Sequence, residues 1–133
     1  MAPVAVVIVL AVLQFLVFAW LVARARARYG IKAPATTGHE IFERWFRVQQ
    51  NTLEMLIAFI PAISLFAIYV NPNWAAWVGL VYIVGRIVYL RAYVADPARR
   101  GLGFALTALP ILLLLVGALL GAVRAMLETN PAA

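Results

Sequence analysis

Long apolar segments separated by short polar ones dominate the pattern of this chain. There are four such segments: Val4–Ala23, Met55–Val70, Trp74–Tyr93 and Leu102–Val123. About 20 apolar residues are enough for a helix to span the hydrocarbon core of a bilayer. The second segment is extended toward its N-terminus by a polar run of helical character. The pattern predicts an all-α fold, an integral membrane four-helix bundle, as a single domain over residues 1–133. Its helices are expected at about 4–24, 39–70, 73–95 and 101–125.

A cleaved signal peptide is a second interpretation of the first apolar segment. The segment has no basic start, and its 20 residues are long for that role. We therefore expect a retained membrane helix.

The amino-acid composition excludes or disfavours several kinds of functional site. The chain has no cysteine, so it has no disulfide, thiolate metal site or cysteine nucleophile. One histidine and five acidic residues disfavour a metal centre. The net charge of +6 suggests nucleic acid or anionic lipid as a partner. Its distribution favours a role in topology instead, so we expect membrane lipids and no nucleic acid among the partners.

The positive side chains gather in the first and third predicted loops. They are Arg24, Arg26, Arg28, Lys32, Arg99 and Arg100. The loop around Pro72 carries no charge. The positive-inside rule then places both termini outside and the two basic loops in the cytoplasm. For Arg24 and Arg28, two interpretations remain open: orientation of the chain together with contact to lipid headgroups, or a more specific functional role. The Ala- and Arg-rich composition indicates a bacterial source with a GC-rich genome, and hence the inner membrane.

Two polar stripes run along the predicted second and third helices. The first stripe contains Arg44, Arg47, Asn51 and Glu54. The second contains Tyr82, Arg86, Tyr89 and Tyr93. Spacings of three and four residues place each set on one helical face. A charge at membrane depth costs several kcal/mol or more, so such residues are usually paired and usually functional.

The two stripes are expected at matching depth. Glu54 lies 16 residues from Val70, or about 24 Å at the rise of an α-helix. Arg86 lies 13 residues from Asn73, or about 20 Å. If the helices are adjacent, the stripes line a polar pocket in the cytoplasmic half of the bilayer, with Glu54 and Arg86 near its floor.

Two interpretations of this pocket remain open. In the first, Glu54 and Arg86 form a buried ion pair that fixes helix packing, and the tyrosines anchor the chain at the interface. In the second, the pocket binds a small ligand with several anionic groups and one ammonium group. Arginine holds carboxylates through two parallel hydrogen bonds, glutamate accepts from an ammonium group, and tyrosine hydroxyls donate or accept. The number of donors favours the second interpretation.

The same residues resemble the signatures of a known family. The run Glu43-Arg44-x-x-Arg47-x-Gln49-x-Asn51-x-x-Glu54 resembles the helix-two signature of the MAPEG family, the membrane-associated proteins in eicosanoid and glutathione metabolism. The helix-three signature is matched by Gly85-Arg86-x-x-Tyr89-x-x-x-Tyr93. The following loop is matched by Asp96-Pro97-x-x-Arg100-Gly101. The resemblance covers nearly the whole chain.

The resemblance implies a homotrimer with glutathione bound between neighbouring protomers. The glutathione ligands it implies are Arg47, Asn51, Glu54, Tyr89 and Tyr93. Gln49 and Arg26 would reach the tripeptide from an adjacent protomer. Arg86 would hold a carboxylate or support the site through Glu54. Arg100 corresponds to the arginine that stabilises the glutathione thiolate, and a one-residue slip in alignment would give that role to Arg99.

The resemblance also implies an activity. Glutathione would be the co-substrate, without a metal, and the second substrate would be a hydrophobic electrophile or lipid hydroperoxide from the bilayer. Met55 replaces a tyrosine of some leukotriene-forming members, and Tyr89 replaces a histidine of the prostaglandin-isomerising members. These departures favour the glutathione transferase and peroxidase branch. The alternatives are a non-catalytic lipid-binding scaffold of the same family and a small transporter, which the uncharged outer half of the bundle disfavours.

Overall fold

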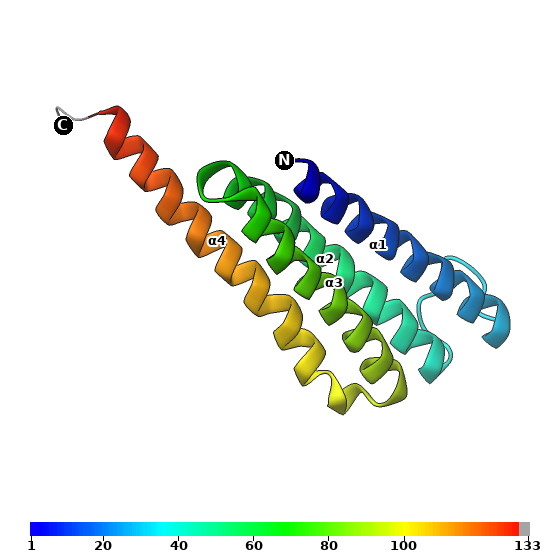
Figure 1. Cartoon of the computed structure of the whole chain (residues 1–133). Coiled ribbons are helices and arrows are strands. Elements are labelled where there is room, and N and C mark those ends of the chain that lie inside the picture. Colours follow the sequence, from blue (N-terminus) through cyan, green and yellow to red (C-terminus); the bar gives the residue numbers. More distant parts are fainter. Residues whose placement is uncertain (131–133) are drawn as a thin grey trace.

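The computed structural model describes residues 1–130, and every element in them is helical (Figure 1). The elements are α1 (Ala2–Tyr29), α2 (Glu40–Tyr69), α3 (Pro72–Ala95), the single 3₁₀ turn η1 (Pro97–Arg99) and α4 (Gly101–Thr129). Residues 131–133, the end of the predicted 1–133 domain, lie outside the described part of the chain. The predicted all-α architecture with four long helices is therefore confirmed.

The helices lie alongside one another in one bundle. The central pair, α2 and α3, pack against each other, and both contact α1 and α4. Figure 1 shows the N-terminus and the α2–α3 turn toward one end of the bundle. The α1–α2 loop and the α3–α4 connection lie at the other end, which we call the loop end. Most of the positive side chains are in the segments at this loop end.

Two helices run further than their apolar segments predicted. The first was expected to end near residue 24 but continues to Tyr29, because its alternating Ala and Arg residues are good helix formers. It ends where Gly30 takes a left-handed conformation (φ 66°) and its backbone N–H donates to the Arg26 carbonyl. The fourth was expected to end near residue 125 and continues to Thr129. Its last turns carry the Arg124–Glu128 ion pair at 2.7 Å, a favourable spacing on a helix.

The apolar side chains divide into a core and an outer surface. Phe59, Ile63 and Leu114 are fully buried between the helices. Large apolar side chains such as Ile57 and Trp77 face outward and are 71% and 67% exposed. Each of the four helices is long and apolar enough to cross a membrane. An apolar exterior of this extent is what a lipid environment requires of a helical bundle.

A close approach between α3 and α4 fixes the geometry near the loop end. Gly103 of α4 lies directly against the backbone of Tyr89 in α3, so that a Cβ atom at residue 103 would collide with the Tyr89 Cα and N atoms. Small residues allow membrane helices to approach in this way. The contact holds the start of α4, and with it Arg100, beside the tyrosines of α3.

Candidate functional site

The two polar stripes meet in one cavity of about 330 Å³ at the loop end of the bundle. Its lining residues come from α2, α3 and the residue just before α4: Arg47, Gln50, Asn51, Glu54, Tyr89, Tyr93 and Arg100. Six of these seven were singled out from the sequence. Two guanidinium groups and one carboxylate give the lining an excess of positive charge, which suits a ligand with more than one anionic group.

Arg86 lies next to this cavity, on the side away from the loop end, and does not line it. It is the one fully buried charged side chain within residues 1–130. Its Nη1 donates to Asn51 Oδ1 at 2.9 Å, and its guanidinium carbon lies 4.3 Å from the centre of the Tyr89 ring. Its Nε and Nη2 are buried without a hydrogen-bond partner among the described residues. Arg86 therefore contacts two residues of the lining, Asn51 and Tyr89, from the side away from the loop end.

The Glu54–Arg86 ion pair considered from the sequence is absent from residues 1–130. The ion pairs within residues 1–130 are Arg44–Glu40, Arg99–Asp96 and Arg124–Glu128. The partner of Arg86 is Asn51 instead. Glu54 is consequently left with its side chain exposed at the cavity, where it is available to a cationic group.

The hydrogen bond from Arg86 fixes which end of the Asn51 side chain is available. Arginine has only donors, so the Asn51 atom that faces it must be the carbonyl oxygen. This leaves the Asn51 NH₂ group as the polar end open to the cavity. Asn51 thus presents donors rather than an acceptor, a third donor group beside Arg47 and Arg100.

Tyr89 and Tyr93 form the α3 wall of the cavity. Their ring centres are 5.5 Å apart and the rings are nearly parallel. Tyr89 is buried, since it packs between Arg86 and the backbone at Gly103, and Tyr93 is half-buried. Both rings are held by their neighbours before any ligand arrives.

The two candidate arginines after α3 have different surroundings. Arg100 lines the cavity, and its Nη1 donates to the Pro97 carbonyl at 3.2 Å. The Arg99 side chain is 78% exposed, lies 3.8 Å from Asp96 and is not part of the lining. Of the two arginines, Arg100 is therefore the one that reaches the cavity.

Besides Arg86, four stripe or site residues lie outside the cavity within one chain. Tyr82 is fully buried and stacks on Phe59 at 3.8 Å. Arg44 caps the end of α3, donating to the carbonyls of Val94 and Ala95 at 3.0 and 3.1 Å, which have no partner within that helix. Arg26 donates to the Ala35 carbonyl at 2.6 Å and lies over the Phe42 ring. Gln49 is half-buried but does not line the cavity. Arg26 and Gln49 were expected to act on a neighbouring protomer's site.

Gln50 is the lining residue that the sequence interpretation missed. It lies three residues after Arg47 and four before Glu54, on the same helical face as both. The signal was therefore present in the spacing. The family signature directed attention to Gln49, one position earlier and about 100° around the helix.

A helical bundle with an apolar exterior, in which each of the four long helices is able to cross a membrane, defines a class, the multi-pass membrane proteins. The model of the MAPEG family matches residues 4–120 of the chain. The protein therefore belongs to the MAPEG family, as its helix-two and helix-three signatures predicted, and it is a multi-pass membrane protein.

Named relatives agree with this membership. An uncharacterized protein of Synechocystis sp. is 50% identical over 116 residues, which cover 87% of this chain and 85% of that protein. Human microsomal glutathione S-transferase 2 is 40% identical over 116 residues, covering 86% and 79% of the two chains. Leukotriene C4 synthase of Cavia porcellus is 34% identical over 120 residues, covering 90% and 80%. The Synechocystis relative is consistent with the bacterial source expected from composition.

Proposed function

We propose that this protein is a membrane-embedded glutathione transferase that activates the glutathione thiolate for attack on lipophilic electrophiles. The observation that carries the proposal is the composition of one cavity, which gathers Arg47, the Asn51 NH₂ group, Glu54 and Arg100. Relatives named as glutathione S-transferases support the choice of substrate. Glutathione has two carboxylates, one ammonium group and a thiol, and the cavity offers a complementary group for each.

The roles of the lining residues follow from their chemistry. Arg47 and the Asn51 NH₂ group donate to the glutathione carboxylates, with Tyr93 and Gln50 as further polar neighbours. Glu54 accepts from the ammonium group. Arg100, in the connection between α3 and α4, stabilises the negative charge on sulfur. A nearby cation lowers the pKa of a thiol, and the thiolate is the nucleophile.

The reaction then needs no covalent participation by the protein. The thiol proton passes to solvent, and the thiolate donates an electron pair to an electrophilic carbon of a substrate dissolved in the bilayer. A carbon–sulfur bond forms, and the leaving group departs with its electron pair or an epoxide oxygen takes up a proton. In the peroxidase version, the thiolate attacks the terminal oxygen of a lipid hydroperoxide. The O–O bond breaks, a lipid alcohol is released, and a second glutathione converts the sulfenic acid to disulfide and water.

The assignment of Glu54 to the ammonium group gives the first test. Calorimetric titration should show that Glu54→Gln binds glutathione about tenfold or more weakly, because a hydrogen bond between charged groups is lost. A glutathione analogue without the amino group should bind the wild type and Glu54→Gln equally. Glu128→Gln, which removes the same charge at the far end of α4, is the matched control and should bind like the wild type.

Two results would contradict this binding mode. If the wild type binds glutathione and the analogue equally, Glu54 does not hold the ammonium group. If no glutathione binding is measurable in the wild type, the proposed substrate is wrong, and the lipid-binding scaffold becomes the better interpretation of the fold.

We further propose that the active form is a homotrimer in which Arg26 and Gln49 complete the cavity of a neighbouring protomer. Within one chain Arg47 and Glu54 are exposed at an open cavity, which leaves room for a second chain. Co-expression of Arg47→Ala protomers with Arg26→Ala/Gln49→Ala protomers tests this sharing. Mixed assemblies contain intact sites, so conjugation activity should reappear although each variant alone is inactive. If the mixed assemblies are as inactive as the two variants alone, each chain has its own complete site and no site is shared.

A further inference from the structure

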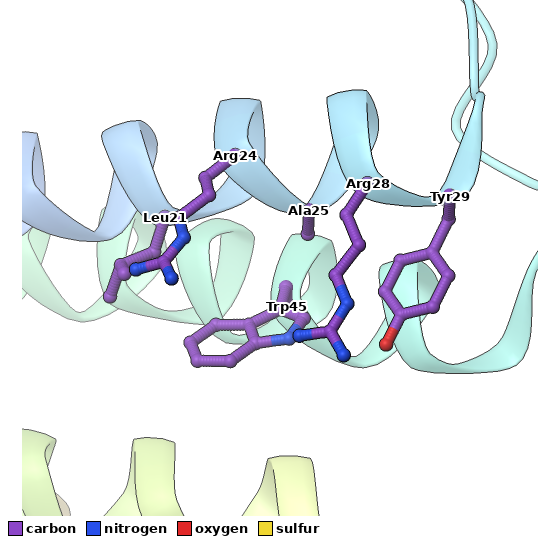
Figure 2. Close-up of a pocket in the computed structure, with 6 residues that line it drawn as sticks. All are labelled: Leu21, Arg24, Ala25, Arg28, Tyr29 and Trp45. Carbon is purple, nitrogen blue, oxygen red and sulfur yellow. The ribbon is translucent and has the colours of Figure 1, made fainter.

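A second, smaller cavity lies at the loop end of the bundle, between α1 and α2 (Figure 2). Its volume is about 180 Å³, and none of its lining residues belongs to the cavity that we propose for glutathione. The lining consists of Leu21, Arg24, Ala25, Arg28 and Tyr29 from α1 and Trp45 from α2. Figure 2 shows the side chains of Arg24, Arg28 and Tyr29 projecting from α1 on the same side as Trp45. The proposed transferase reaction uses none of these residues.

The positive charge of this cavity is not compensated within the described chain. Arg24 and Arg28 are four residues apart, and like charges at this spacing destabilise a helix. The lining contains no acidic residue. Neither arginine forms an ion pair or a hydrogen bond within residues 1–130. By contrast, Arg44, Arg99 and Arg124 each have an acidic partner.

An aromatic ring lies near each of the two guanidinium groups. The Arg24 guanidinium lies 5.8 Å from the centre of the Trp20 ring, and that of Arg28 lies 5.6 Å from the Tyr29 ring. Tyr29 in turn stacks on His39 at 4.0 Å. His39 caps α2 by accepting from the Ile41 N–H through Nδ1 at 3.1 Å. Contact with a ring face leaves the arginine N–H groups free to donate.

The cavity lies where the apolar part of α1 ends. Arg24 is the first charged residue after the apolar segment Val4–Ala23. Leu21 forms the apolar wall of the cavity, and Val17 and Trp20 continue an exposed apolar surface along α1 at 53% and 59% exposure. A ligand with an anionic head and a hydrocarbon tail fits this arrangement, with the head at the arginines and the tail along α1.

We propose that this cavity binds the phosphate group of an anionic membrane lipid. Arg24 and Arg28 donate to the phosphate oxygens, since guanidinium groups match phosphate geometry. The indole N–H of Trp45 and the hydroxyl of Tyr29 are further donors at the same cavity. A role in topology alone requires arginines on one side of the membrane but neither a cavity nor aromatic supports. The exposed apolar surface that continues from Leu21 to Val17 and Trp20 makes a lipid, rather than free phosphate, the preferred source of this anion.

Native mass spectrometry of the delipidated full-length protein tests the proposal. The detergent micelles should contain equal amounts of phosphatidylglycerol and phosphatidylcholine with the same acyl chains. We expect the wild type to retain phosphatidylglycerol selectively and Arg24→Gln/Arg28→Gln to lose about tenfold or more of that selectivity. The matched control is Lys32→Gln/Arg91→Gln, which removes two positive charges outside this cavity and should keep the selectivity. Glutathione binding should stay unchanged in both variants and verifies that they are folded.

Each other outcome would overturn the proposal. Equal loss in both double variants would mean that diffuse charge, rather than this cavity, attracts anionic lipid. Absence of selectivity in the wild type would mean that another occupant, such as a second copy of the chain, covers the cavity. Displacement of the lipid by an equal concentration of inorganic phosphate would make the ligand a free anion of the aqueous phase rather than a lipid.

Discussion

Replacement of Arg100 with alanine is expected to lower the turnover of glutathione conjugation by about 100-fold while leaving glutathione affinity mostly intact. Removing one preorganised donor that faces developing negative charge has effects of this size in other enzymes, about 100- to 1,000-fold. Without the Arg100 guanidinium, the thiol of bound glutathione returns toward its ordinary pKa. A thiol with an ordinary pKa is only a few per cent ionised at about pH 7. Lost turnover with retained binding identifies an interaction made in the transition state.

Ultraviolet absorbance of the glutathione thiolate gives a direct measurement of the same effect. The wild type in detergent should develop the thiolate band at neutral pH when titrated with glutathione, and Arg100→Ala should develop it only at higher pH. Arg99→Ala is the control, because it removes the same charge from a mostly exposed side chain beside Asp96. If Arg99→Ala loses the band and Arg100→Ala keeps it, the one-residue alternative is correct. If both keep the band and the turnover, the catalytic role assigned to this connection is wrong.

The four helices, and the position of the two stripes beside each other, could be predicted from the sequence. The apolar segments were long and well separated, and spacings of three and four residues determine which side chains share a helical face. The location of Arg100 at the cavity was accessible only through the resemblance to a family. No periodicity relates a residue after α3 to a stripe on α2.

The partner of Arg86 could not be predicted by counting residues. Helical rise gives the depth of a backbone position, about 20 Å for Arg86 and 24 Å for Glu54, and so suggested an ion pair between them. The guanidinium lies at the end of a long flexible side chain, so the charge is several ångströms from its own Cα. In the structure it contacts Asn51, which lies three residues before Glu54 in α2, toward the loop end. Arg44 shows the same effect, since its side chain extends from the stripe to the end of α3.

From the contact between Arg86 and Asn51 we predict that Arg86 is a positioning residue, and Arg86→Met is the test. Methionine keeps the apolar bulk of the side chain and removes the donor to Asn51 Oδ1. The Asn51 amide is then free to rotate, and its NH₂ group is no longer held toward the cavity. We expect glutathione to bind about tenfold or more weakly, since a hydrogen bond to a charged group is lost. Calorimetric titration of the detergent-solubilised protein measures this change.

The thermal stability of Arg86→Met should not fall together with its affinity for glutathione. Arg86 has two buried nitrogens without a partner among residues 1–130, and a buried charge that is incompletely hydrogen-bonded costs folding free energy. The thermal midpoint of Arg86→Met should therefore be equal to or above that of the wild type. Asn51→Ala should weaken binding similarly, and the double variant should be no worse than either single one, because both changes remove one linked interaction. Additive losses would mean that Arg86 contacts glutathione itself, and a lower midpoint would mean that it mainly holds the helices together.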